Sequence, residues 1–436
     1  MKDQPKSHSL YWIETYGCQM NIAESNALEI SLQKADIRKA EKVEDADCVI
    51  INTCSVRKTA ENRIWGRIGF FKHLKESRDL TLIITGCMAE RLHDQIIDQA
   101  PAVDHVVGTN DKYRIAAILS GAKDERKEEY TFTRNYHKEG EISSFIPIMN
   151  GCNNFCSYCI VPYVRGREVS RSVDSILDEV KRLEDLGVKE ITLLGQNVNS
   201  YSFTDNGIRY GFPDLLEKIT RTLDSVKWVR FESPHPKDFS KELISLLGQE
   251  KKLPHHLHVP MQSGSTRILD AMRRKYTRES FLSLIEDIKK AVPDMTFTTD
   301  VMVGFPGETE DDFLQTLSAM NEIGFIEAFM YYFNPREGTK AVDMEPQVPV
   351  DIRLERLNRL IKNQRVLTRS YKEQHCHDIV EVLVESLSKK NENQYLGRSQ
   401  HSEMVVFEPK GQLIAGDEVQ VQLKKISGNT YTGIQL

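Results

Sequence analysis

Three cysteines near the middle of the chain have the spacing of a loop that binds a metal cluster. Cys152, Cys156 and Cys159 follow the pattern Cys-x3-Cys-x2-Cys within Gly151-Cys-Asn-Asn-Phe-Cys-Ser-Tyr-Cys-Ile160. A loop this short can hold three corners of a cubane iron–sulfur cluster, and the nearby sequence offers no cysteine for the fourth corner. An iron with an open position can bind substrate, as a catalytic zinc with an open position does. The spacing therefore predicts a catalytic iron–sulfur cluster.

The main alternative for this motif is a zinc knuckle, which would need a fourth ligand shortly downstream. Pro162, Tyr163 and Arg165 follow the last cysteine instead. With the aromatic Tyr158 before that cysteine, the spacing resembles that of radical S-adenosylmethionine enzymes. The resemblance implies that the open iron chelates the amino and carboxylate groups of the methionine moiety. It also implies that an electron from the cluster cleaves the sulfonium to a 5′-deoxyadenosyl radical.

A second set of three cysteines is spread over the first hundred residues, and each follows an expected strand and precedes an expected helix. The expected strands cover residues 11–17, 47–53 and 80–86, and the expected helices cover residues 21–33, 56–70 and 88–100. This alternation predicts a parallel sheet whose strands all end at one edge. Cys18, Cys54 and Cys87 should therefore converge, each at a helix N-terminus where the dipole favours a thiolate. We predict a second iron–sulfur cluster there.

Ordinary burial is the alternative for these cysteines, since free cysteine is among the most buried residue types. It suits Cys48, within an expected strand, and Cys376, in a polar run. One cysteine at the same junction of three consecutive strand–helix units favours convergence instead.

Composition points to an ordinary globular chain in a reducing compartment. Eight cysteines in 436 residues make no dense disulfide framework. The first ten residues lack the apolar segment of a signal peptide, and no apolar run is long enough for a membrane span. We therefore expect a cytoplasmic monomer of about three domains with no membrane partner. A net charge of −6 argues against a general polyanion binder but leaves room for local basic surfaces that contact structured RNA.

Residues 143–374 read as repeated strand–helix pairs. The expected strands cover 145–149, 190–194, 228–232, 256–260, 297–303 and 327–333, with helices between them. Six units are too few for a full eight-stranded barrel, so we expect a partial (β/α)6 barrel, with another domain covering its open side to shield a radical from water. Candidate cofactor contacts lie at the strand ends and in the cysteine loop: Tyr158, Gln196, Asn197, Ser233, Gln262 and Asp300. Each strand-end residue could instead be a satisfied turn residue.

Three further features of this region have simpler readings. His255, His256 and His258 suggest zinc, but no further ligands follow at zinc spacing, so packing and hydrogen bonding are expected. The turn at 304–308 lacks the Lys and Ser/Thr of a phosphate loop, and we expect its backbone to approach the adenine of the cofactor. The expected helix 351–373 is rich in Lys and Arg, and either a solvated face or phosphate contact would explain it.

The last sixty residues alternate apolar and polar residues in five short segments separated by glycines. This pattern predicts a small antiparallel β-barrel of the OB type over 375–436, a fold that commonly binds single-stranded nucleic acid. Positive and stacking groups are available in this segment: Arg398, Lys410, Lys424, Lys425, Tyr395 and Tyr431. Small barrels also bind proteins or act as spacers.

The whole chain resembles the methylthiotransferase family of radical S-adenosylmethionine enzymes. Four motifs carry the resemblance: Glu14-Thr-Tyr-Gly-Cys-Gln-Met-Asn21, Asn52-Thr-Cys-Ser-Val-Arg57, Thr85-Gly-Cys-Met-Ala89 and Tyr158-Cys-Ile-Val-Pro-Tyr-Val-Arg-Gly-Arg-Glu168. The resemblance implies an α/β architecture with three domains. These are a methylthiotransferase domain at 9–125, a radical S-adenosylmethionine partial barrel at 143–374 and a TRAM barrel at 375–436.

The stretch after Cys159 looks most like the branch that acts on N6-isopentenyl(dimethylallyl)adenosine-37, beside the tRNA anticodon. This branch implies two [4Fe-4S] clusters, held by the two cysteine triads, and two S-adenosylmethionine molecules. One is the methyl donor for a sulfur on the N-terminal cluster, and the other is the radical source. The radical abstracts hydrogen from C2 of the adenine, where methylthio is delivered. The implied partners are the tRNA anticodon stem-loop and a reductant such as flavodoxin or ferredoxin.

Three alternatives remain open from the sequence. Related branches of the family modify threonylcarbamoyladenosine in tRNA or an aspartate of a ribosomal protein. A more distant alternative is an electron carrier with two clusters and no catalytic activity, which would need two fully ligated clusters. The sequence supplies three cysteines for each cluster, and this favours an enzyme.

Overall fold

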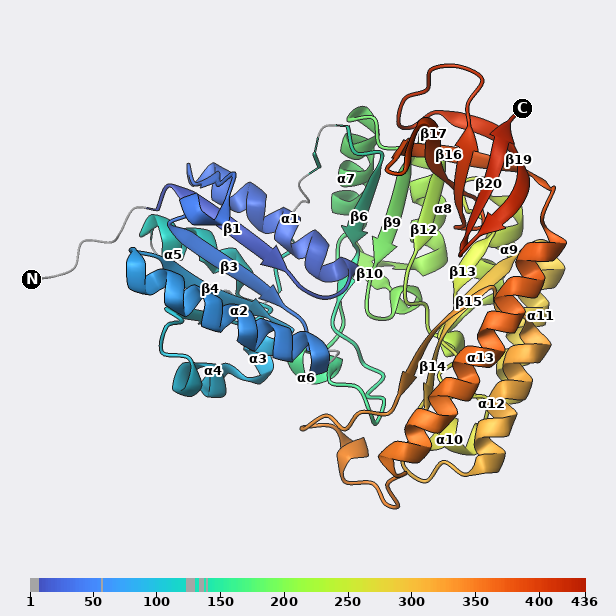
Figure 1. Cartoon of the computed structure of the whole chain (residues 1–436), viewed down its shortest axis with the longest axis horizontal. Helices are drawn as coiled ribbons and strands as arrows, with labels where there is room; N and C mark the ends of the chain where they lie inside the picture. Colours follow the sequence, from blue (N-terminus) through green and yellow to red (C-terminus); the bar gives the residue numbers. More distant parts are fainter. Residues whose placement is uncertain (1–7, 56–57, 123–129, 133–136, 139) are drawn as a thin grey trace, which may run out of the picture. The chain divides into compact units, whose positions relative to one another are not determined.

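The computed structural model describes residues 8–55, 58–122, 130–132, 137–138 and 140–436 (Figure 1). The chain forms two compact units. The first unit comprises Met1–Lys138, Phe145–Asn153 and Ile160–Arg171, and the second comprises Glu139–Ser144, Asn154–Cys159 and Ser172–Leu436. The second cysteine loop therefore begins in the first unit and ends in the second.

A five-stranded sheet in the order β2-β1-β3-β4-β5 forms the centre of the first unit, and every neighbouring pair is parallel. Its strands are β1 (Leu10–Thr15), β2 (Arg38–Lys39), β3 (Cys48–Thr53), β4 (Thr81–Gly86) and β5 (His105–Val107). Its helices are α1 (Gln19–Lys34), α2 (Lys58–Ser77), α3 (Cys87–Arg91), α4 (His93–Gln99) and α5 (Ile115–Ser120), with 3-10 turns η1 (Val43–Asp45) and η2 (Lys112–Arg114). The parallel sheet predicted from the sequence is confirmed.

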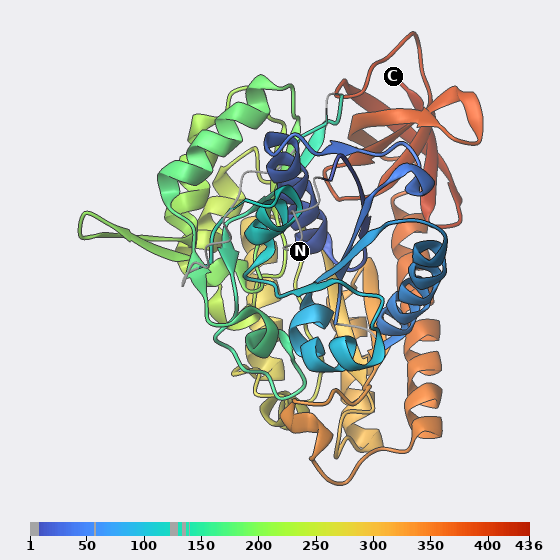
Figure 2. The ribbon, with the colours of Figure 1, turned by 90° about the vertical axis from the view of Figure 1, so that its left-hand side faces the viewer.

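Alternate residues of β3 and β4 face opposite sides of this sheet, as strand geometry requires. Ile51 and Ile84 pack with the apolar side chains of α2, α3 and α4, whereas Ile50 and Ile83 pack with those of α1 and α5. Helices therefore cover both faces of the sheet (Figures 1 and 2), and β3 is buried along its whole length. This explains why its first four residues, 48–51, form a continuous apolar run rather than an alternating pattern.

Two expected helices of this unit differ in extent from the structure. The expected helix at 88–100 is two short helices, α3 and α4, and the backbone at Leu92 between them has a φ of −112° and a ψ of 26°, outside the helical region. The expected helix at 56–70 extends to Ser77, and its first two residues lie outside the described residues. The first unit also contains α6 (Val161–Arg165) and the antiparallel pair β7 (Met149–Asn150) and β8 (Val169–Ser170).

The second unit contains two sets of parallel strands with helices between them. β9 (Glu190–Leu194) pairs with β12 (Trp228–Phe231), and β13 (His256–His258), β14 (Thr296–Val303) and β15 (Glu327–Tyr332) form a second sheet. The backbone N–H groups of Lys189 and Glu190 donate to the carbonyl of Ile142, which precedes β6 (Ser143–Pro147). The strands expected after residue 150 are all present, although β13 is shorter than expected.

The helices and remaining short elements of this unit connect those strands. They are α7 (Val173–Asp185), α8 (Phe212–Thr222), α9 (Lys241–Gln249), α10 (Thr266–Ala271), α11 (Arg278–Ala291), α12 (Glu310–Ile323), α13 (Val350–Gln374), the turns η3 (Val198–Ser200), η4 (Pro236–Asp238) and η5 (Lys340–Val342), and the hairpin β10 (Ser202–Asp205) and β11 (Ile208–Gly211). The sequence analysis did not predict the hairpin or α10.

The last five strands close into a ring in the order β16-β17-β18-β20-β19 around an apolar core. They are β16 (Ile379–Ser388), β17 (Asn391–Ser399), β18 (Met404–Glu408), β19 (Glu418–Ser427) and β20 (Thr430–Gln435). The expected purely antiparallel arrangement is wrong, because β18 and β20 pair in parallel. A ring with an odd number of strands cannot alternate direction throughout, so at least one neighbouring pair must be parallel. Among the described residues, no helix is long and apolar enough to cross a membrane.

Candidate cofactor sites

The first cysteine triad lies along the carboxyl edge of the sheet in the first unit. Cys18 is the N-cap of α1, Cys54 directly follows β3, and Cys87 is the first residue of α3 after β4. The three strands are neighbours, in the order β1-β3-β4. The strand–helix pattern therefore correctly placed all three cysteines at one edge, with Cys54 and Cys87 buried and Cys18 exposed.

Glycines permit the close approach of these strand ends. A Cβ added to Gly17 would lie 3.2 Å from the Cys54 sulfur and 2.8 Å from its Cβ. Gly86 has a φ of +95°, and a Cβ there would lie 2.4 Å from the Thr53 carbonyl oxygen. A side chain at either position would push the cysteine segments apart, so the edge is built to bring its backbone close together.

A buried ionic network lies beneath this edge, and the sequence analysis did not find it. The Arg165 guanidinium donates to the Glu24 carboxylate over 2.6 Å and to the Asn150 side-chain oxygen over 3.0 Å. Lys112 also pairs with Glu24. Burial alone would raise the pKa of Glu24, but the Arg165 and Lys112 charges outweigh it and lower the pKa to about 2.

Arg165 also lies within electrostatic reach of the first triad. Burial would lower the pKa of its guanidinium, but Glu24, Cys87 and Cys18 all act in the opposite direction and raise it. A buried cation stabilises neighbouring thiolates, which are the form of cysteine that binds iron. Only three-dimensional contact reveals this role, because the arginine is 141 residues from Glu24 in sequence.

In the first unit, backbone contacts fix the start of the second cysteine loop. Gly151 has a φ of +82°, and a Cβ there would lie 2.1 Å from the Arg167 carbonyl oxygen. The Cys152 N–H donates to the carbonyl of Gly166 over 3.1 Å. This position therefore requires glycine.

In the second unit, the end of the loop is fixed at Ser157. Its hydroxyl donates to the Ala271 carbonyl over 2.8 Å, its N–H donates to the Met272 carbonyl over 3.1 Å, and its own carbonyl accepts from the Ala341 N–H over 2.8 Å. The Cys159 N–H donates to the Cys156 carbonyl over 3.0 Å, which closes a turn between the two cysteines.

Tyr158 packs against an apolar cluster formed by Ile268, Met272, Phe305, Phe333 and Ala341. Arg274, which the sequence analysis did not single out, donates to the Cys156 sulfur over 3.5 Å.

Two of the strand-end candidates have buried oxygens without a hydrogen-bond partner among the described residues: Gln196 Oε1 and Asn197 Oδ1. Asn197 donates to Asp238 through its nitrogen over 2.8 Å, so only its oxygen is left over. A buried acceptor without a donor is costly, and a bound ligand with N–H or O–H groups would satisfy it.

The other strand-end candidates have unusual backbone or charged partners. Ser233 and Gln262 have φ values of +60° and +65°, which is left-handed backbone that non-glycine residues seldom adopt. Asp300 lies 3.4 Å from His258 Nε2. His256 and His258 also form hydrogen bonds with Thr296 and Thr298, over 3.0 and 3.1 Å. These bonds support the packing role expected for the histidines.

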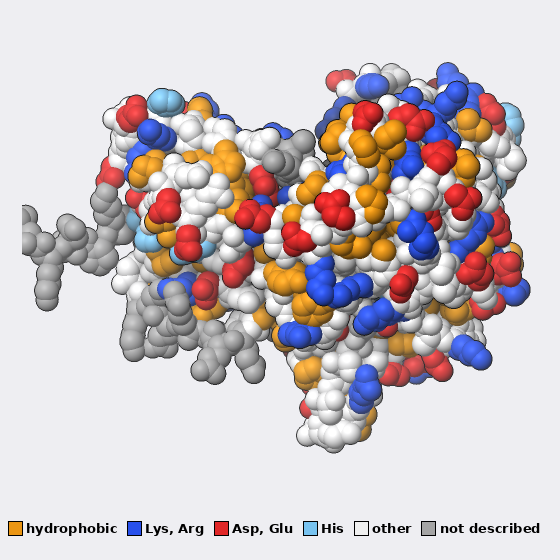
Figure 3. Space-filling view, turned by 90° about the horizontal axis from the view of Figure 1, so that it is seen from below, with side chains coloured by type: hydrophobic (Ala, Val, Ile, Leu, Met, Phe, Trp, Pro, Cys, Tyr) orange, Lys and Arg blue, Asp and Glu red, His pale blue; other side chains and the backbone are white. Residues whose placement is uncertain are grey.

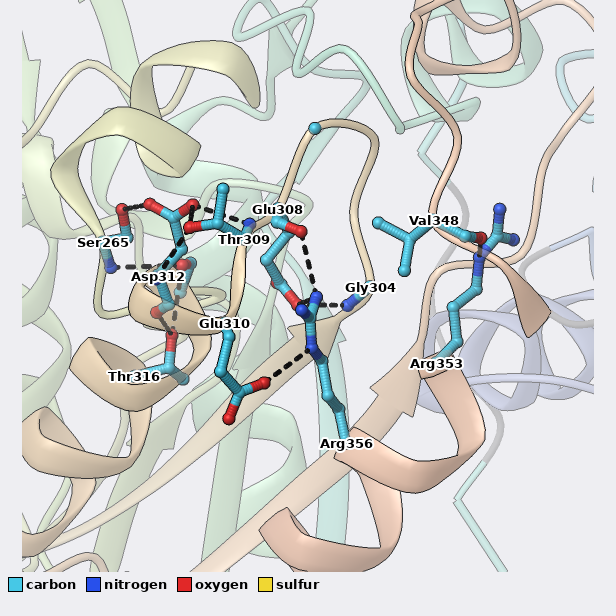
Figure 4. A network of polar contacts seen from close by, with 12 residues as sticks. Ser265, Gly304, Glu308, Thr309, Glu310, Asp312, Thr316, Val348, Arg353 and Arg356 are labelled. Atoms are coloured by element: carbon cyan, nitrogen blue, oxygen red, sulfur yellow. Dashed lines mark hydrogen bonds and ion pairs between the residues drawn. The ribbon is translucent and has the colours of Figure 1, made fainter. Parts of the chain in front are cut away.

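Two arginines of the basic helix α13, Arg353 and Arg356, are buried and support the turn at 304–308 (Figure 4), whereas Lys362, Arg365 and Arg369 of the same helix are exposed. The Gly304 N–H donates to Glu308 Oε1 over 2.7 Å, and Arg356 donates to the same oxygen over 2.9 Å. Arg353 donates to the carbonyls of Val348 and Phe333 over 2.6 and 2.9 Å. For these buried arginines, phosphate contact was the wrong alternative, because their guanidinium groups are used inside the protein.

None of the described residues form a group of three His, Cys, Asp or Glu side chains arranged to hold a metal ion. The assignment of Cys18, Cys54, Cys87, Cys152, Cys156 and Cys159 as ligands therefore stays a prediction. Its support lies in their placement at one sheet edge and in one tightly fixed loop.

Comparison with known proteins adds independent information. The profile of the Radical SAM superfamily matches residues 146–320, and that of Uncharacterized protein family UPF0004 matches residues 10–108. Similar curated relatives come from Treponema pallidum (strain Nichols), 46% identical over 96% of this chain and 97% of the relative, and Treponema denticola, 43% identical over 97% and 98%. A relative from Phocaeicola vulgatus is 40% identical over 97% and 95%. All three are named tRNA-2-methylthio-N(6)-dimethylallyladenosine synthase.

Solved structures show a similar fold at low sequence identity. The radical S-adenosylmethionine methyltransferase TsrM from Kitasatospora setae matches with a TM-score of 0.57 and 14% identity, over 77% of this chain and 74% of that chain. The cobalamin-dependent S-adenosylmethionine radical enzyme OxsB matches with a TM-score of 0.51 and 10% identity, over 83% and 56%. At these identities the likeness shows a mixed α/β fold of the radical S-adenosylmethionine type and nothing about substrate.

Proposed function

This chain belongs to the tRNA-2-methylthio-N(6)-dimethylallyladenosine synthase family of radical S-adenosylmethionine enzymes, and from this we propose how its residues serve the reaction. The enzyme methylthiolates C2 of N6-isopentenyladenosine in tRNA. Identity of 46% over 96% of the chain is the observation that carries this conclusion. The proposed target is adenosine-37, next to the anticodon, in an unstacked anticodon loop.

The second triad, Cys152, Cys156 and Cys159, is proposed to hold a [4Fe-4S] cluster. Three thiol donors in one short loop suit such a cluster and leave one iron open. When bound, this cluster and S-adenosylmethionine supply the one-electron chemistry that generates a 5′-deoxyadenosyl radical. The chain's own contribution is to fix the loop, through the Gly151 backbone and through the three hydrogen bonds of Ser157.

The first triad is proposed to hold a second [4Fe-4S] cluster. Cys18, Cys54 and Cys87 end three neighbouring strands, and Gly17 leaves room for the Cys54 sulfur. The buried Arg165 supplies a positive charge within electrostatic reach of Cys18 and Cys87. In the proposed cycle, one S-adenosylmethionine serves as methyl donor and a second as radical source.

Six residues of the second unit are proposed as contacts for S-adenosylmethionine: Tyr158, Gln196, Asn197, Ser233, Gln262 and Asp300. The strongest support is the pair of buried oxygens on Gln196 and Asn197, which lack donors among the described residues. The amino and ribose hydroxyl groups of S-adenosylmethionine are suitable donors. The unusual backbone of Ser233 and Gln262 also fits a site where main-chain groups approach a ligand.

We propose three domains: a methylthiotransferase domain at 9–125, a partial (β/α)6 barrel at 143–374 and an OB-like TRAM domain at 375–436. The closed ring of strands supports the last assignment. Exposed Lys410, Lys424 and Lys425 lie on it and are available for tRNA phosphates. Figure 3 shows Lys and Arg mixed with Asp and Glu on the face seen from below, so that face is not uniformly basic.

The further partners and location are also proposals. A low-potential reductant such as flavodoxin or ferredoxin would supply the electron, and the protein would act as a cytoplasmic monomer. A helix capable of crossing a membrane is lacking in the part of the chain that the structure describes.

Nucleoside mass spectrometry tests the substrate. A strain lacking this gene should lose 2-methylthio-N6-isopentenyladenosine from its tRNA and accumulate N6-isopentenyladenosine. The wild-type gene should restore it, and a Cys156→Ala variant should not. Unchanged tRNA in the deletion strain would overturn the substrate assignment. Parallel analysis of threonylcarbamoyladenosine and ribosomal proteins separates the related branches.

A further inference from the structure

One buried arginine contacts a cysteine of the proposed catalytic cluster. Arg274 is 6% exposed, and its Nη1 donates to the Cys156 sulfur over 3.5 Å. Its Nη2 donates to the Pro260 carbonyl and its Nε to the Tyr276 hydroxyl, each over 3.2 Å. The Tyr276 hydroxyl in turn donates to the Met261 carbonyl over 2.8 Å. All three nitrogens of the guanidinium are used, so its position is closely determined.

The backbone around Arg274 is held in an unfavourable conformation. Arg273 and Lys275, on either side of it, have φ values of +59° and +60°. Both side chains are exposed, so neither gains packing that would offset the cost. Left-handed backbone at a residue other than glycine is unfavourable and is found preferentially at functional sites. The turn keeps this strain while placing Arg274 inward.

The same turn also holds the cluster loop. Ala271 and Met272, at the end of α10, accept both hydrogen bonds that Ser157 donates. Ser157 is the residue after Cys156, so the guanidinium and the cysteine are fixed to one short segment. The position of the Arg274 guanidinium relative to the Cys156 sulfur is therefore fixed by the backbone contacts of both segments.

A neighbouring histidine, His235, stays neutral and therefore adds no second positive charge beside Arg274. His235 lies edge-to-face against Tyr276, with ring centroids 5.6 Å apart. Burial lowers the pKa of His235 to about 2, and the charges of Arg274, Lys237 and Lys275 act in the same direction.

We infer that Arg274 is a positioning residue that donates a hydrogen bond to the Cys156 thiolate and thereby raises the reduction potential of the cluster. This inference rests on the proposed function. Reduction adds one electron from the reductant to the cluster, with no bond broken and no proton transferred by Arg274. A fixed cation and donor at a ligand sulfur stabilises the more negative, reduced state. Arg274 would therefore ease the electron transfer that precedes cleavage of S-adenosylmethionine.

Redox titration followed by electron paramagnetic resonance tests the inference. In protein carrying Cys18→Ala, Cys54→Ala and Cys87→Ala, only the proposed catalytic cluster would be titrated. Arg274→Gln should then reduce the ratio of reduced to oxidised cluster at a fixed potential by about tenfold, which is about 59 mV for a one-electron couple. Arg274→Lys keeps the positive charge but loses the planar set of guanidinium donors, so a smaller shift of the midpoint potential in the same direction is expected. Arg273→Gln is the matched control, because it removes an exposed arginine one residue away and should leave the midpoint unchanged.

The outcomes separate this inference from the proposed function. If Arg274→Gln binds iron fully and its midpoint equals that of the parent, the inference is overturned. If that variant loses its cluster, Arg274→Lys decides in the same way, and a parental midpoint overturns it. If the parent itself holds no cluster, or if S-adenosylmethionine leaves its reduced spectrum unchanged, the proposed function fails first.

Discussion

Arg165 and Glu24 form a buried ion pair, with 2.6 Å between Nη1 and Oε1, across 141 residues of sequence. Glu24 lies in α1, the helix that begins after Cys18, and Arg165 ends α6, the helix that follows the second cysteine loop. The pair therefore joins, within the first unit, the segments that adjoin the two proposed cluster sites. Its integrity should matter for stability before any cofactor is bound.

Glu24→Gln should destabilise the protein by about 3 kcal/mol at pH 7. The carboxyl is buried and its pKa falls from 4.5 to about 2, and a tenfold change in an acid dissociation constant corresponds to about 1.4 kcal/mol. Because the folded pKa is depressed, the contribution is fully present above pH 4.5 and is lost as pH falls from 4.5 to 2. Chemical denaturation of the apoprotein at several pH values measures both effects.

Glu29→Gln is the matched control for this prediction. Glu29 lies in the same helix and pairs with the exposed Lys39 over 2.7 Å, so its loss should cost under about 1 kcal/mol. Equal losses for the two variants would contradict the role given to the buried pair.

Substitution of the first triad should remove one cluster and leave the other. After anaerobic reconstitution, wild-type protein should contain about eight irons, and the triple variant Cys18→Ala, Cys54→Ala, Cys87→Ala about four. Cys48→Ala should keep about eight, because Cys48 is buried within β3 and burial raises the pKa of its thiol, which disfavours the thiolate form that binds iron. Iron and sulfide assays decide, and an unchanged content in the triple variant would exclude a second cluster at this edge.

The sequence was informative where periodicity and spacing carry the signal. The strands β1, β3 and β4 could be predicted because each is an apolar run before a cysteine and a helix, and parallel strands must end at one edge. The roles of Arg165, Arg274 and Arg356 could not be predicted, because each depends on a partner far away in the chain. The basic residues of α13 illustrate the difficulty, since the sequence shows their charge but not the carboxylates and carbonyls that use it.

Gly304→Ala should disrupt the turn that α13 supports. Gly304 has a φ of +70°, and an added Cβ would lie 2.4 Å from Arg353 Cγ, a side chain anchored by its own hydrogen bonds (Figure 4). The variant should lose more than about 1 kcal/mol of stability and bind S-adenosylmethionine more weakly. Thermal unfolding and equilibrium dialysis measure the two effects.

Gly324→Ala separates the clash from the backbone cost. Gly324 ends α12 with a φ of +73°, and a Cβ added there meets nothing within 4 Å. This control should lose about 1 kcal/mol of stability and bind S-adenosylmethionine normally. If both glycine variants bind the cofactor equally well, the turn at 304–308 does not support the cofactor site.

Removing two lysines from the ring of strands should weaken tRNA binding through the phosphate backbone. Lys424 and Lys425 are adjacent and exposed on β19. Arg398, in contrast, forms an ion pair with Glu385, with 2.9 Å between Nε and Oε1. If both lysines contact phosphates, Lys424→Ala/Lys425→Ala should reduce the slope of log K against log salt by about 1.4 for single-stranded contacts.

The matched control is Lys241→Ala/Lys251→Ala, which removes two exposed lysines at and after α9. Fluorescence anisotropy with an anticodon stem-loop at several salt concentrations measures the slopes, and equal slopes for the two double variants would show that tRNA does not contact this part of the ring.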